Sequence, residues 1–112
     1  MTIINEPKSL DELWESKEAE FTELMKIVVD VSRRILAIDA DMHADLEEIL
    51  LEDGSKQSDL WGANIYPAKE GEDYLEYTSF INIKPSDNNK DMEVVDPQIR
   101  EQIKEIVHFA SS

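Results

Sequence analysis

The sequence contains no cysteine, which excludes disulfides, thiolate metal sites and cysteine nucleophiles. It opens without a leader of the secretory type, and no apolar run approaches the length of a membrane span, so we expect a cytoplasmic protein. The GxGxxG, P-loop, GxSxG, HExxH and EF-hand patterns are also missing. No common catalytic motif therefore identifies an enzyme, and the sequence favours a protein without catalytic activity.

Basic residues are scarce, with 11 Lys and Arg against 26 Asp and Glu, which gives a formal net charge of −15. This balance repels phosphate backbones and anionic lipids, so we predict neither a nucleic-acid nor a membrane partner. A basic partner protein, a cation, or solubility alone would each fit it. With 112 residues, of which 41% are hydrophobic, the chain is expected to form a single domain spanning residues 1–112.

The first part of the chain has helical spacing. Ser9 and Glu12 form a capping box, which predicts a helix beginning at Ser9. Apolar residues then recur at steps of three and four up to Ile38, which favours further helix after a break near residues 20–22. The segment 25–31 is nevertheless rich in β-branched residues, so a hairpin turning at residues 32–34 is the alternative.

The middle of the chain has the pattern of a meander. Residues 42–51 fit either a strand or a helix ended by Gly54, and the Asp53-Gly54 turn signal before a clear strand favours a strand. Residues 60–66 and 74–84 are the other two predicted strands. Leu51 opposite Leu60 is the expected register, because it places the apolar side chains of both strands on one face.

The last helix has a clear start. Asp96 is placed to cap it, and Pro97 takes the first helical position, where its missing N–H costs nothing. Its expected buried stripe consists of Ile99, Ile103, Ile106 and Val107. The predicted fold class is therefore α+β, with N-terminal helices, a three-stranded antiparallel meander, and a C-terminal helix packed on one face of the sheet.

The sharpest candidate for chemistry is the group His43, Asp45 and Glu47. On a strand, two-residue spacing points the three side chains the same way, about 7 Å apart at each step. They would suit a divalent metal such as Mn²⁺ or Fe²⁺, or a general base with orienting carboxylates. The alternative is the solvated face of a one-sided sheet.

Two asparagines stand in predicted strands, where this residue is disfavoured. Asn64 and Asn82 are therefore expected to have hydrogen-bonding roles, either in support of a turn or bulge or in contact with a ligand.

The sequence contains the short motifs HADLE, LLEDGS, LWGANIYP, INIKP and DPQIR. Through these motifs it resembles a family of small prokaryotic proteins known only as a domain of unknown function. The resemblance spans about residues 20 to 109. It departs at Asp39-Ala40, where the resemblance leads us to expect two glycines. Because no activity, cofactor or partner is associated with that family, the resemblance implies no functional residue.

These observations lead to two main hypotheses. The first is a protein-binding or regulatory module without a cofactor, based on small size, acidity and the lack of a catalytic motif. The second is a small metal-dependent hydrolytic enzyme that uses His43, Asp45 and Glu47. An acidic mimic of DNA, acting on a basic protein, ranks third because it depends on charge alone.

Overall fold

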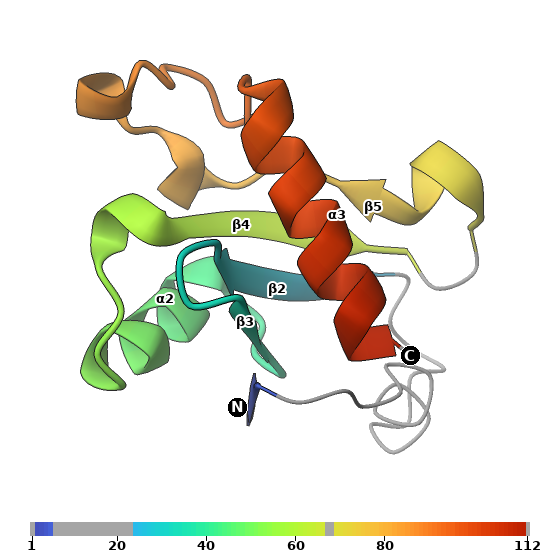
Figure 1. The fold of residues 1–112 in the computed structure, drawn as a ribbon, viewed down its shortest axis with the longest axis horizontal. Helices are drawn as coiled ribbons and strands as arrows, with labels where there is room; N and C mark the ends of the chain where they lie inside the picture. The colour runs from blue at the N-terminus through green and yellow to red at the C-terminus, as the bar shows by residue number, and fades with distance from the viewer. Residues whose placement is uncertain (1, 6–23, 67–68, 112) are drawn as a thin grey trace.

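The computed structural model describes residues 2–5, 24–66 and 69–111. The helix predicted to begin at Ser9 lies outside these ranges. Five antiparallel strands form one sheet in the described part, with α2 behind it and α3 in front of it (Figure 1). This confirms the α+β class and corrects the three-stranded meander to a five-stranded sheet.

The sheet has the strand order β1-β3-β2-β4-β5. Its strands are β1 (Thr2–Ile4), β2 (Met25–Asp30), β3 (Ile35–Ile38), β4 (Leu60–Ile65) and β5 (Leu75–Glu76), and the helices are α2 (His43–Glu52) and α3 (Pro97–Ser111). Each face of the sheet has its own apolar core. Leu46 and Leu50 of α2 pack on Val28 and Leu60, while α3 packs on the opposite face.

The segment 25–38 is a hairpin, so the helix predicted there is wrong and the alternative is confirmed. Strands β2 and β3 pair antiparallel, with Val28 opposite Ala37. Helices cover both faces of these strands, so apolar residues fall at nearly every position. Such a run also matches helical spacing, which explains the error. In the turn, Asp30 Oδ1 accepts hydrogen bonds from the backbone N–H groups of Ser32 (2.9 Å) and Arg33 (2.8 Å).

The segment 42–51 is helical, so the predicted strand is wrong here too. The helix α2 ends at Glu52 and is capped by Asp53, and Gly54 follows with a φ of 106°, a conformation that glycine adopts without strain. Gly54 therefore ends a helix and does not turn a hairpin. Without a strand at 42–51, the predicted pairing of Leu51 with Leu60 is also wrong, and Leu60 lies opposite Asp30 of β2.

The strand predicted at 60–66 is confirmed as β4, but only a short part of the next strand forms. β5 ends at Glu76, and the chain then enters irregular structure that contains the 3₁₀ turns η4 (Phe80–Asn82) and η5 (Pro85–Asp87). Most of the strand predicted at 74–84 is therefore wrong.

The C-terminal helix is confirmed. Asp96 Oδ1 accepts a hydrogen bond from the backbone N–H of Gln98 at 2.8 Å, and α3 begins at Pro97. Ile103, Ile106 and Val107 are buried against the sheet, while Ile99 is only partly buried. Neither described helix combines the length and apolarity that crossing a membrane requires.

Candidate functional site

The first residue of α2 lies directly over β4. His43 Nε2 is 2.8 Å from the backbone oxygen of Ala63. Because a carbonyl only accepts, Nε2 carries the hydrogen, and the neutral ring then has a free lone pair on Nδ1. Burial lowers the pKa of His43 below its usual 6.5, the Ala63 hydrogen bond raises it, and the nearby Lys26 lowers it further. The imidazole is therefore neutral near pH 7.

Asn64 lies beside His43, and its side chain connects β4 to β5 and to the segment that follows β5. Its Nδ2 donates to Glu76 Oε1 at 2.8 Å and to the backbone oxygen of Thr78 at 3.2 Å. Both partners are acceptors, so the orientation of the amide is fixed. Oδ1 is buried and makes no hydrogen bond of standard geometry to a described residue, but the Asn64 side chain lies close enough to His43 to raise the pKa of the imidazole. Lys26, opposite Asn64 on β2, adds a half-buried cation.

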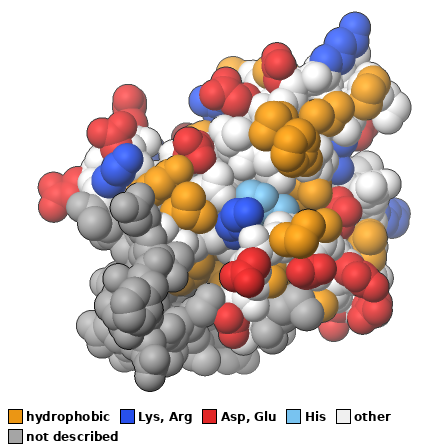
Figure 2. Space-filling view, turned by 180° about the vertical axis from the view of Figure 1, so that it is seen from behind, with side chains coloured by type: hydrophobic (Ala, Val, Ile, Leu, Met, Phe, Trp, Pro, Cys, Tyr) orange, Lys and Arg blue, Asp and Glu red, His pale blue; other side chains and the backbone are white. Residues whose placement is uncertain are grey.

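An apolar surface adjoins these polar groups. Phe80 is 75% exposed, Met42 57% and Ile83 43%. Met42 precedes α2, Phe80 and Ile83 belong to η4 and the residue after it, and α2 contacts η4. Figure 2 shows hydrophobic side chains gathered around a histidine near the middle of the face opposite α3, with acidic side chains at its margin. We call Met42, His43, Phe80 and Ile83 the α2–η4 surface.

Asn82 holds η4 against the sheet. Its Oδ1 accepts from the Gly62 N–H at 2.8 Å, and its Nδ2 donates to the Gly62 oxygen and to the Met92 oxygen, both at 3.0 Å. The side-chain amide thus makes the two hydrogen bonds that a continuing β5 would have made. A Cβ at Gly62 would lie 2.5 Å from the Cβ of Ser79, so only glycine permits this close approach.

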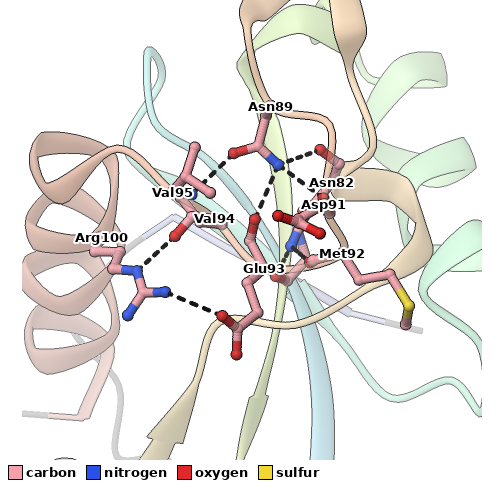
Figure 3. A network of polar contacts seen from close by, with 9 residues as sticks. Asn82, Asn89, Asp91, Met92, Glu93, Val94, Val95 and Arg100 are labelled. Atoms are coloured by element: carbon pink, nitrogen blue, oxygen red, sulfur yellow. Dashed lines mark hydrogen bonds and ion pairs between the residues drawn. The ribbon is translucent and has the colours of Figure 1, made fainter.

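Asn89 closes the loop behind η4 (Figure 3). Its Nδ2 donates to the backbone oxygens of Asn82 (2.7 Å), Asp91 (2.9 Å) and Glu93 (2.9 Å), and its Oδ1 accepts from the Val95 N–H at 2.9 Å. One buried side chain therefore satisfies four backbone groups that have no ladder partners.

Arg100 fastens the end of this loop to α3. Its Nε donates to the Val94 oxygen, and its guanidinium lies 5.1 Å from the ring centroid of Tyr77 and 3.8 Å from Glu93 Oε2 (Figure 3). The loop that carries Phe80 is thus held at both ends.

Lys84 anchors the same loop to the start of β4. Its Nζ donates to the backbone oxygen of Gln57 at 2.6 Å and lies 5.2 Å from the ring centroid of Trp61. Burial lowers the pKa of this ammonium group, and the carboxylate of Glu47 acts in the opposite direction. A buried, partnered lysine therefore fixes the loop four residues after Phe80.

The structure does not bring His43, Asp45 and Glu47 together as predicted. On a helix, residues two apart point to nearly opposite sides, so Asp45 faces solvent while His43 and Glu47 share a side. No three His, Asp or Glu side chains are grouped to hold a metal ion anywhere in residues 2–5, 24–66 and 69–111. The shared face on which the metal hypothesis depended is therefore absent.

The hydrogen-bonding roles predicted for the two asparagines are present in the structure. Asn64 and Asn82 both have hydrogen-bonding roles, and Asn82 supports irregular backbone as expected. His43 and Asn64 lie side by side because α2 begins above β4.

Sequence reasoning missed Lys26, Glu76 and Phe80. Lys26, Val28 and Asp30 are two residues apart, so they share one face of a strand. Assigning residues 25–30 to a strand would therefore have placed Lys26 on the face that α2 covers. Phe80 has no comparable signal, because a strand pattern gives no warning that the chain turns into η4.

The pH dependence of stability provides a test of the His43 environment. Because the folded state lowers the pKa of His43, the unfolded chain binds more protons at slightly acidic pH. The stability that depends on neutral His43 is fully present above pH 6.5 and is lost as pH falls through the lowered folded-state value. Urea titrations from about pH 5 to 7.5 should show a steeper rise of unfolding free energy in the wild type than in His43→Gln.

The control is His108→Gln, which removes the other imidazole from an exposed position in α3. Equal slopes for the wild type and His43→Gln would contradict the buried, neutral assignment of His43.

Comparison with protein families gives one match. The model of a family described as "Protein of unknown function (DUF5674)" matches residues 2–110. The resemblance seen in the sequence is confirmed to that extent. Neither the curated proteins nor the solved structures gave a match.

Proposed function

The chain belongs to the DUF5674 family of proteins of unknown function, and from that premise we propose that it is a protein-binding module that uses the α2–η4 surface. Its partner contacts Phe80 and Met42 and covers the rim of His43.

The exposure of Phe80 is the single observation that carries this proposal. A phenylalanine that is 75% exposed keeps most of its apolar area in water. Met42 and Ile83 extend the exposed area, and aromatic residues and methionine are enriched at protein interfaces. Contiguous apolar surface of this kind marks interaction sites more often than does a lone exposed residue.

The rigidity of η4 gives further support. The Ser79 side chain accepts from the Ile81 N–H at 3.3 Å, and Asn82 ties the turn to Gly62. Ile81 packs on the core beneath α2, so the adjoining Phe80 projects from a fixed backbone. A preorganised anchor loses little conformational freedom when a partner binds.

The arrangement of α2 gives no support to a metal-dependent enzyme. Its support was the strand geometry of His43, Asp45 and Glu47, and these residues lie on α2.

Co-purification from the source cells with matched variants tests the proposal. Tagged wild-type chain should recover a stoichiometric protein at low and at moderate salt, and Phe80→Ser should reduce its recovery about tenfold or more, as expected for an interface anchor. Phe109→Ser is the control, because Phe109 is 48% exposed but lies on α3. Capture alone is not sufficient, because the informative result is its dependence on Phe80.

Two outcomes would overturn the proposal. One is the absence of any stoichiometric partner at either salt concentration. The other is equal recovery by Phe80→Ser and the wild type, which would place the partner elsewhere on the chain.

A further inference from the structure

We propose that the α2–η4 surface binds a cationic amphipathic segment of its partner, an inference that rests on the protein-binding function proposed above. Apolar side chains of that segment pack on Phe80 and Met42, and its Lys or Arg side chains face the acidic residues of α2.

The charge around the surface is the first argument. From Asp39 to Asp53 the chain has seven acidic residues and no lysine or arginine. Most of these side chains are exposed: Asp39, Asp41, Asp45, Glu48, Glu52 and Asp53. Arg33 pairs with Asp53 at 2.7 Å, but this pair lies at the far end of α2 from Met42. Among the described residues, no salt bridge joins Asp41, Asp45 or Glu48 to a lysine or arginine.

Among the described residues, Lys26, His43 and Lys84 are the basic groups that adjoin this surface or lie under it, and they do not cancel this field. Lys26 is one half-buried cation, and burial keeps His43 neutral near pH 7. Lys84 donates to Gln57 and faces Glu47, Asp87 and Asp59, so its charge is already matched. The rim of the surface is therefore acidic, and a basic partner complements it.

The apolar centre is the second argument. A purely electrostatic encounter needs no hydrophobic side chain, yet Phe80 and Met42 are the most exposed large apolar residues described. Lysine and arginine stems pack along apolar surfaces while their charged ends remain in water, and a guanidinium or ammonium is attracted to an aromatic face. A segment with both apolar and cationic side chains fits this surface better than either kind alone.

A second copy of the chain is the less favoured occupant. Two chains with a formal charge of −15 each repel one another, and pairing through this face would oppose the acidic rims of the two copies.

Three synthetic amphipathic peptides of the same length provide the test, built from leucine with lysine, with glutamate or with glutamine. Each is titrated into the full chain and followed by amide chemical shifts. The Leu/Lys peptide should shift the amides of residues 42–48 and 80–83 and bind about tenfold more weakly to Phe80→Ser, but not to Phe109→Ser. Its affinity should fall several-fold when salt rises from ~50 to ~300 mM.

A variant with neutralised α2 acids distinguishes the effect of these local charges on peptide affinity from the effect of the overall negative charge. Asp41→Asn, Asp45→Asn and Glu48→Gln together should weaken the Leu/Lys peptide at least fivefold and leave the Leu/Gln peptide unchanged. The matched control removes three exposed charges from the 3₁₀ turn before β5 and its flank, with Glu70→Gln, Glu72→Gln and Asp73→Asn, and should change little.

The outcomes distinguish this inference from the proposed function. Equal binding of all three peptides at the α2–η4 surface would overturn the cationic partner and leave the docking surface in place. The inference would also be overturned if substitutions at Phe80 and at the α2 acids left the affinity for the Leu/Lys peptide unchanged. Amide chemical-shift changes confined to other residues would overturn it too. Self-association that depends on Phe80 would identify a second copy as the occupant.

Discussion

Asn82→Asp should lower the melting temperature by at least about 10 °C, although it exchanges one NH₂ group for one oxygen. Asn82 is fully buried, and its Nδ2 donates to the backbone oxygens of Gly62 and Met92. In the variant, a carboxylate oxygen faces those two carbonyls. Each buried polar group left without a partner costs about 1–3 kcal/mol, and a buried unpaired charge adds to this.

The control for Asn82→Asp is Asn88→Asp. Asn88 is exposed and has a φ of 60°, a conformation that aspartate tolerates almost as well as asparagine. The two variants carry the same change in formal charge, so their difference reports on the buried contacts. Thermal melts followed by circular dichroism measure it.

A pH titration sharpens this test. The buried carboxyl of Asn82→Asp should have a raised pKa, because burial disfavours its charged form. Its folded state then binds more protons than its unfolded state, so its stability relative to Asn88→Asp should rise as pH falls towards about 5. Equal melting temperatures for the two variants, or no relative gain at low pH, would contradict the assigned contacts.

Asn82 also connects stability to the proposed interface. It holds the turn on which Phe80 is exposed, so its loss would disturb the α2–η4 surface without any direct contact with a partner. Loss of binding in Asn82 variants would therefore say little about the interface. Phe80 and the exposed acids of α2 are the informative positions, because their side chains can change without disturbing the core.

The last helix was predictable because its signals are local. Asp96 and Pro97 define its start, and the buried residues of α3 recur at helical spacing on one face only. The strand β4 was also predicted, since it is rich in apolar residues and follows a turn signal. In both cases the local preference and the tertiary environment agree.

The hairpin of β2 and β3 was not predicted because both of its faces are buried. Periodicity separates helix from strand only when one face is polar, and residues 27–29 are completely buried on both faces of the sheet. The β-branched side chains were the better guide. Asp30 was a second signal, since an aspartate often accepts hydrogen bonds from the next backbone N–H groups in a turn.

The candidate site was only partly predictable. His43 and Asn64 were correctly chosen as noteworthy polar residues, but their association depends on where α2 begins relative to β4. Phe80 depends on a chain reversal that Asn82 stabilises through contacts 20 residues distant in sequence. Pattern rules describe neighbours along the chain, so contacts of this range are not accessible to them.

Ile103→Asp should unfold the domain or leave it far less stable than the wild type. Ile103 is fully buried on α3, in the core that includes Trp61 and Val94. Truncating a buried isoleucine costs about 2–5 kcal/mol, and the unpaired carboxylate adds a desolvation cost. A domain of this size is typically stable by about 5–15 kcal/mol, so the substitution removes a large share of that stability.

Lys104→Asp is the control for Ile103→Asp. Lys104 is the next residue on α3 and is exposed, so this variant places the same aspartate in the same helix without burying it. The melting temperature of Lys104→Asp should stay within a few degrees of the wild type. Ile103→Asp should either be unfolded already at 25 °C or have a far lower melting temperature. A melt of Ile103→Asp within a few degrees of Lys104→Asp would mean that α3 does not pack on the sheet through Ile103.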